Sequence, residues 1–103
     1  MLKIQRLANG RVVYTLSGRM DAEQAGGLDK LLSDESEEIK IVVDLRDLTL
    51  VDRDAVRFLE RCEAGGITLR NSPAYIRLWI DRERSYARLR SERGNLPDAT
   101  REE

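Results

Sequence analysis

Apolar and polar residues alternate at the start of the chain, and this period of two predicts strands rather than helices. The alternation covers Leu2 to Arg6 and returns from Arg11 to Ser17. Asn9-Gly10 lies between the two segments and favours a tight hairpin turn, because both residues tolerate a positive φ. Gly18 is expected to end the second strand.

Beyond the hairpin, the spacing changes to that of helices separated by short strands. Three consecutive apolar residues, 41–43, indicate a buried strand at 40–44, so the segment from there to Asp52 is expected to be a loop. Gly26 and Gly27 weaken the first predicted helix relative to alanine, and we expect them to let another backbone approach closely. The segments predicted after the hairpin are helix 22–32, strand 40–44, helix 53–64, strand 67–70 and helix 73–93.

The predicted element order is β-β-α-β-α-β-α, which indicates an α/β fold with a mixed sheet and helices packed on it. Right-handed crossovers place the helices that begin at Ala22 and Arg53 on one face of that sheet. Residues 1–93 are expected to form a single domain. Gly94, Asn95 and Pro97 are expected to end the last helix, which leaves residues 94–103 as a flexible tail.

With 103 residues, 41% of them apolar and 36% charged, the chain is long enough for one folded domain. Its 18 basic and 19 acidic residues leave a net charge of −1, so the overall charge points neither to nucleic acid nor to an anionic membrane. The sequence shows no signal peptide and no apolar run long enough to span a bilayer, so a cytoplasmic location is expected.

The chain has no histidine and a single cysteine, Cys62, and these counts exclude most catalytic sites. A Ser–His or Cys–His pair is impossible, and one thiolate cannot by itself hold a metal. Cys62 lies on the apolar stripe of its predicted helix and is expected to be a core residue. We therefore expect neither enzymatic activity nor a cofactor or metal.

The most informative charged segment is the start of the predicted helix 53–64. Asp52, Arg53 and Asp54 lie where backbone N–H groups point outward and negative charge is favoured. Arg53 is expected to neutralise one of the two aspartates. The rest of the sequence offers no competing site.

A D-L-x-x-L-x-x-V-D pattern runs from Asp44 to Asp52, directly before this helix. Together with three further segments, it resembles the STAS domain, the module of anti-sigma-factor antagonists and of sulphate-transporter tails. The resemblance spans roughly residues 2–80. The segments that carry it are T-L-S-G-R-M-D at 15–21, V-V-D-L-R-D-L-T-L-V-D at 42–52, V-R-F-L at 56–59 and G-G-I-T-L-R-N-S-P at 65–73.

In bacterial members of that family, the loop entering the second helix carries a serine that a GHKL-type kinase phosphorylates, and this kinase is also the anti-sigma factor. The family pattern is D-S-S-G-L or D-S-A-G-L, whereas this chain has D-R-D-A-V. Asp54 aligns with the acceptor serine, so no phosphosite is expected there. The resemblance implies partner binding by a switch loop, Asp52, Arg53, Asp54, Ala55 and Val56, and by a neighbouring loop, Gly18, Arg19 and Asp21.

Two interpretations of Asp54 stay open. Its carboxylate resembles a permanent but weaker phosphoserine, with a charge near −1 instead of about −1.5 to −2. Alternatively, it only caps the helix, where the helix dipole favours an acid. The function implied is a constitutive anti-sigma-factor antagonist that binds a GHKL-type kinase. The alternative is a structural or dimerisation module of a larger sensory complex.

The last predicted helix departs from the family, which has a fifth strand and a final helix after its third helix. One stripe of it, Ile76, Trp79, Ile80 and Glu83, is expected to dock on the sheet. An overlapping apolar face needs a second partner, and we expect either a homodimer or a helix folded back over its own sheet edge. The residues expected to bury against a second copy are Tyr75, Leu78, Trp79, Tyr86 and Leu89.

Overall fold

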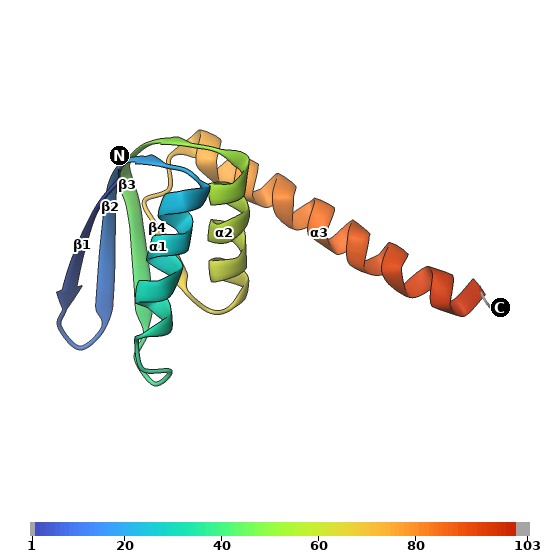
Figure 1. Ribbon diagram of the computed structural model, residues 1–103, viewed down its shortest axis with the longest axis horizontal. Coiled ribbons are helices and arrows are strands. Elements are labelled where there is room, and N and C mark those ends of the chain that lie inside the picture. Colours follow the sequence, from blue (N-terminus) through green and yellow to red (C-terminus); the bar gives the residue numbers. More distant parts are fainter. Residues whose placement is uncertain (1, 101–103) are drawn as a thin grey trace.

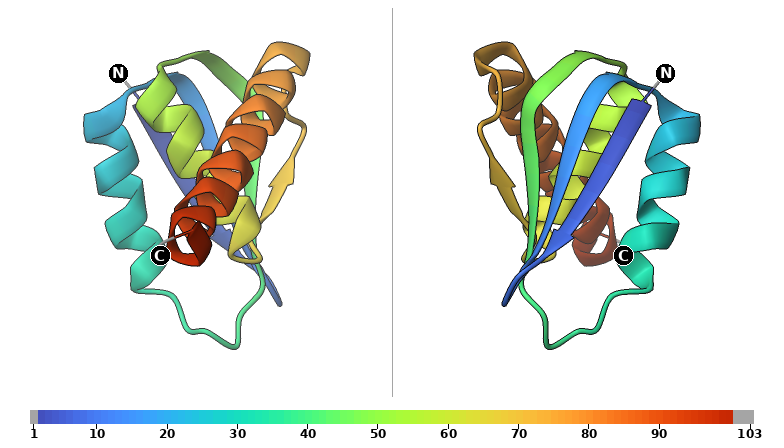
Figure 2. Two further views of the ribbon diagram at one scale, coloured as in Figure 1. Left: turned by 90° about the vertical axis from the view of Figure 1, so that its right-hand side faces the viewer. Right: turned by 90° about the vertical axis from the view of Figure 1, so that its left-hand side faces the viewer.

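The computed structural model describes the backbone of residues 2–100 and the side chains of residues 2–89, and its element order is the predicted one (Figure 1). A four-stranded sheet forms one layer, and the helices lie on one of its faces (Figure 2). The elements are β1 (Leu2–Ala8), β2 (Val12–Met20), α1 (Ala22–Ser33), β3 (Ile41–Val51), α2 (Arg53–Ala64), β4 (Thr68–Arg70) and α3 (Ala74–Thr100).

The sheet has the strand order β1-β2-β3-β4 and is mixed, as predicted. β1 and β2 form an antiparallel hairpin in which Leu2 pairs with Gly18 and Ala8 with Val12. Gly10 has a φ of +79° in the hairpin turn, a conformation that glycine adopts without strain. β2, β3 and β4 run parallel, so their carboxyl ends reach the same edge of the sheet.

Two strands are longer than predicted, and the boundaries expected for them were wrong. β3 continues to Val51, because Leu45, Leu48 and Val51 bury their side chains under the helices. β2 continues past Gly18 to Met20. The register between β2 and β3 shifts twice in this region, and these irregularities interrupt the period of two that is typical of a regular strand.

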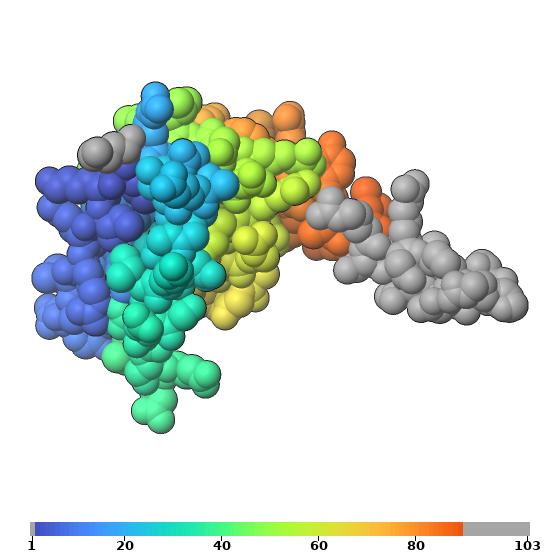
Figure 3. Space-filling view, viewed as in Figure 1, coloured from blue at the N-terminus to red at the C-terminus, as the bar shows by residue number. Residues whose placement is uncertain are grey.

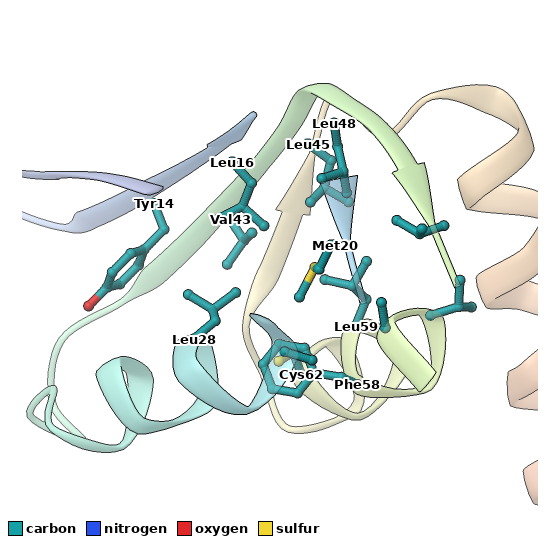
Figure 4. Close-up of a cluster of buried hydrophobic side chains, with 14 of the residues drawn as sticks. Tyr14, Leu16, Met20, Leu28, Val43, Leu45, Leu48, Phe58, Leu59 and Cys62 are labelled. Atoms are coloured by element: carbon teal, nitrogen blue, oxygen red, sulfur yellow. The ribbon is translucent and has the colours of Figure 1, made fainter. Parts of the chain in front are cut away.

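The core lies between the sheet and helices α1 and α2, which share one face of the sheet as predicted (Figure 1). Side chains from β2 and β3 interdigitate with those of the two helices (Figure 4). Cys62 is buried in this core, which confirms its predicted place. The fully buried side chains of the core include Tyr14, Leu16, Met20, Leu28, Val43, Leu45, Val56 and Leu59.

Helix α3 packs against α2, whereas the sequence predicted that it docks on the sheet. Ile76 and Ile80 are fully buried. Beside them, α2 and α3 are joined by ion pairs that we call the α2–α3 clasp. One part of the clasp joins Arg53 and Arg57 to Glu83, and the other joins Glu60 and Glu63 to Arg77 and Arg84. Arg57, Glu60 and Glu63 thus face this third helix.

Helix α3 continues to Thr100, so the expected end near Arg93 was wrong (Figure 1). Gly94 and Pro97 lower helix stability, but they do not by themselves force the backbone out of the helical conformation. The expected flexible tail at 94–103 lies partly outside the described residues. Between Asn71 and Thr100 no further strand follows β4, which is a departure from the family that the chain resembles, since that family has a fifth strand. Within residues 2–100, none of the helices combines the length and apolar character that a membrane span requires.

Gly26 and Gly27 do not allow a close backbone approach, so that expectation was wrong. A Cβ atom added at either position would meet nothing within 4 Å, and both residues are exposed on α1.

We predict that Gly26→Ala and Gly27→Ala each raise the free energy of unfolding by about 0.5–1 kcal/mol, because alanine loses less backbone entropy in a helix. Urea denaturation measures the effect. Gly10→Ala, at a positive φ, is the control and should lower stability.

Because the clasp contains carboxylates that must stay ionised, the free energy of unfolding should depend on pH in the acid range. Hydrogen bonds from Arg77 lower the pKa of Glu63 from 4.5 to about 2, against burial and with help from Arg84. A lowered folded-state pKa stabilises the protein above pH 4.5 and ceases to do so as the pH falls toward 2. Glu63→Gln should therefore cost about 1 kcal/mol at pH 7, and the difference from wild type should shrink below pH 4.5. Denaturation at several pH values tests this. Glu37→Gln, in an exposed loop, should show no such trend.

Candidate partner-binding site

The carboxyl ends of β2 and β3 bring the two predicted loops together at one edge of the sheet (Figure 1). Met20 and Val51 are register partners, and the Asp52 N–H donates to the Met20 carbonyl oxygen at 3.3 Å. Each strand then leads directly into a helix, β2 into α1 and β3 into α2. The amino ends of α1 and α2 therefore lie next to each other, and we call this surface the helix-start edge.

An aspartate caps each helix at this edge. The Asp21 carboxylate accepts from the N–H groups of Glu23 at 3.0 Å and Gln24 at 3.1 Å, and the Gln24 side chain accepts from the Asp21 N–H, which completes a capping box. The Asp52 carboxylate accepts from the Ala55 N–H at 2.9 Å. Such caps contribute about 1 kcal/mol each. Both carboxylates border one shallow hollow, to which Arg19 also contributes.

The exposed part of the switch loop is smaller than the resemblance implied. Asp52, Arg53 and Asp54 are exposed, whereas Ala55 and Val56 are fully buried and belong to the core. In the neighbouring loop, Arg19 and Asp21 are exposed. The side-chain surface available to a partner is thus limited to these five residues among those predicted.

Gly18 lies inside β2 rather than in a loop. Its φ is +97°, and the register between β2 and β3 shifts directly after it. A side chain would be strained at this φ, so glycine allows the irregular pairing between β2 and β3 just before Arg19. Its role is to shape the backbone here.

Arg53 does not neutralise Asp52 or Asp54, contrary to expectation. Its Nε donates to Glu83 Oε2 at 3.2 Å, and Arg57 Nε donates to Glu83 Oε1 at 3.3 Å. Glu83 has only 5% of its surface exposed, so it needs these cationic partners to be buried at a tolerable cost. Glu83 was expected on a buried stripe, but its cationic partners were not predicted. Two arginines one helical turn apart, Arg53 and Arg57, are the feature of the sequence that indicates them.

Asp54 lines a shallow hollow between α1 and α2, together with Arg57 and Arg61. The two helices lie side by side (Figure 3). Among residues 2–89, no basic side chain lies within ion-pair distance of the Asp54 carboxylate. With Asp21, Glu23 and Asp52, it makes the helix-start edge predominantly acidic. Such a surface attracts a basic segment of a partner protein.

The described residues offer no catalytic arrangement at this edge. Burial raises the pKa of the Cys62 thiol to about 12, so it is a poor nucleophile, and it lies in the core. Residues 2–89, whose side chains the structure describes, contain no group of three or more potential ligands that could hold a metal.

Asp44 has a structural role. Burial alone would raise its pKa, but hydrogen bonds from the Arg46 N–H, Asn71 and Arg70 outweigh burial and keep its pKa below the usual value. These bonds tie the middle of β3 to β4 and to the turn that precedes α3. Asn71 adopts a φ of +58° in that turn.

We predict that Glu83→Ala lowers the free energy of unfolding by about 1–3 kcal/mol, because it removes a buried carboxylate that joins two arginines. Asp81→Ala is the matched control, since Asp81 lies on the same helix in an exposed pair with Arg77 and should cost less than about 1 kcal/mol. Urea denaturation measures both. Equal losses in the two variants would contradict a central role for Glu83.

Comparisons with known proteins agree on the fold. No protein-family model matches the chain, and no curated protein matches it either. Among solved structures, the anti-sigma factor antagonist SpoIIAA in its unphosphorylated form is similar, with a TM-score of 0.56 and 19% identity over 87% of this chain and 98% of SpoIIAA. The structure of Mglu gives a TM-score of 0.51 and 22% identity over 66% of this chain and 18% of Mglu.

A DUF3478 protein from Shewanella loihica PV-4, described as having a SpoIIAA-like fold, matches at a TM-score of 0.49 and 13% identity, over 62% of this chain and 56% of that protein. This chain thus spans less than a fifth of Mglu and just over half of the Shewanella protein, but nearly all of SpoIIAA. The likeness to SpoIIAA confirms the predicted fold: the chain has a STAS-like fold with a four-stranded mixed sheet.

Proposed function

We propose that this chain is a non-catalytic protein-binding domain of the anti-sigma-factor antagonist type, working in a bacterial partner-switching module in the cytoplasm. The observation that carries the proposal is the helix-start edge, where Asp21, Asp52 and Asp54 are exposed together on a SpoIIAA-like fold. The partner class we infer is a GHKL-type kinase that also acts as an anti-sigma factor. Recognition would use the acidic edge and the exposed side of α2.

The charge on Asp54 supports constitutive behaviour. A carboxylate at this position carries about −1 at neutral pH, while a phosphoserine would carry about −1.5 to −2. Arg53 is held by Glu83, so it leaves the negative charge of Asp54 uncompensated. The edge then resembles a weaker, permanent form of the phosphorylated state, and its affinity for the kinase should be correspondingly reduced.

A second candidate function is a structural or dimerisation module of a larger sensory complex. The observation that favours it is the exposed apolar face of α3, where Tyr75, Leu78, Tyr86 and Leu89 are all about half exposed. This function does not require the helix-start edge to bind anything.

We predict that Asp54→Ser strengthens binding to a GHKL-type kinase, because it removes the fixed charge and restores a hydroxyl group at the acceptor position. Affinity capture from the host lysate with wild type, Asp54→Ser and Asp54→Ala as baits, followed by titration of the captured kinase, measures the change. A gain of roughly tenfold would correspond to about 1.4 kcal/mol. Incubation with the captured kinase and ATP should phosphorylate the Asp54→Ser variant and leave the Asp54→Ala variant unmodified.

Glu37→Ser is the matched control, since it removes the same charge from the exposed loop between α1 and β3. It should bind like wild type. If no bait recovers a GHKL-type kinase, or if Glu37→Ser and Asp54→Ser change affinity equally, the antagonist function is wrong. Recovery of one unrelated scaffold protein by all baits would favour the second candidate.

A further inference from the structure

Helix α3 presents a narrow apolar stripe to solvent. Tyr75, Leu78, Tyr86 and Leu89 are 47%, 55%, 52% and 55% exposed. With Arg82, also exposed, they fall within about 80° of arc on a helix with 3.6 residues per turn. Ile76, Ile80 and Glu83, which are buried against the domain, lie on the far side of the helix. We call these five exposed residues the α3 stripe.

The domain covers the α3 stripe only in part. The Tyr75 hydroxyl donates to the Thr49 carbonyl oxygen of β3 at 2.7 Å, but the four apolar side chains stay about half exposed. The C-terminal half of α3 projects away from the sheet and the other helices (Figure 1). Among the side chains described, which end at Leu89, the clasp reaches along α3 to Glu83 and Arg84, while the stripe continues to Leu89. A helical segment as short as this projecting half of α3 is only marginally stable in water unless one apolar face packs against a partner. A partner that covers the stripe must therefore be elongated, like another helix.

The spacing of the stripe identifies a second copy of this chain as that partner. From Tyr75 to Leu89, the intervals are three, four, four and three residues, so the pattern is symmetric about Arg82. A twofold interface uses the same surface on both copies and must be self-complementary. Two antiparallel helices centred at Arg82 bring Tyr75 and Leu78 of each copy onto Leu89 and Tyr86 of the other. We propose that the chain forms an antiparallel homodimer through the α3 stripe, with the twofold axis at Arg82.

The available area fits this partner. The four exposed apolar residues leave on the order of 500 Å² uncovered, at the upper end of what monomers expose. Two copies would bury about 1,000 Å², close to the lower limit for a specific interface. A reversible dimer of moderate affinity is expected. Trp79, which packs against the core of its own domain, borders the α3 stripe and does not belong to it.

Arg82 sets the register of the pair. On the twofold axis the two Arg82 side chains approach each other, and their like charges weaken the dimer. A single polar position in an apolar seam costs stability but fixes register and orientation. The inference is independent of Asp54 and of the proposed kinase partner.

Single cysteines test the axis directly. The native Cys62 is buried, so wild type is the cross-linking control. Under mild oxidation, Arg82→Cys should give a disulfide-linked dimer on a non-reducing gel, because each residue 82 faces its own copy. Leu89→Cys should not cross-link with itself, but it should do so when mixed with Tyr75→Cys. Cross-linking of Leu89→Cys alone, without the mixed product, would show a parallel pair and overturn the proposal.

Sedimentation equilibrium tests the α3 stripe without any cross-link. Wild type should show a reversible dimer, and Leu78→Asp should weaken dimerisation by at least tenfold while its circular dichroism stays unchanged. Leu31→Asp is the matched control, because Leu31 is an exposed leucine on α1 outside the stripe. It should dimerise like wild type. A wild type that stays monomeric up to its solubility limit, or equal weakening in both variants, would refute the α3 dimer and leave the proposed kinase binding untouched.

Discussion

The placement of Glu83 between Arg53 and Arg57 is the interaction on which the rest of the surface depends. A buried carboxylate requires cationic partners, and here both come from the first turns of α2. This requirement fixes how α3 lies on α2, and it directs Arg53 toward α3. The helix-start edge remains acidic, and the α3 stripe faces solvent, as consequences of the same three side chains.

The domain therefore carries two exposed surfaces of opposite chemistry. The helix-start edge is small and acidic, and it is shaped by the capping residues Asp21 and Asp52, whose backbone partners hold them in place. The α3 stripe is apolar with an arginine at its centre. An edge of fixed charges suits a charged partner segment, whereas a long apolar stripe suits another helix. The two proposals rest on these separate features.

The sequence was sufficient to predict the order of the elements and the mixed sheet, because local patterns determine them. Asp21 and Asp52 are recognisable as caps from their own neighbours. The length of β3 was not predictable in this way, since the two register shifts beside it interrupt the alternation. Nor was the partner of Arg53, because Glu83 lies thirty residues away and meets it only after α3 packs on α2. Long-range pairing of charges requires the tertiary structure.

Arg53 lies where the two surfaces meet, since it begins α2 and also lines a hollow with Tyr75, Leu78 and Tyr86 of the α3 stripe. If the two proposals hold, a second copy seated on α3 covers a residue of the switch loop, and the kinase and the dimer compete for it. By mass action, the fraction of chains free to bind the kinase then falls as the protein accumulates. Doubling the expression level would less than double the regulatory output, so the domain would limit its own dosage without any modification enzyme.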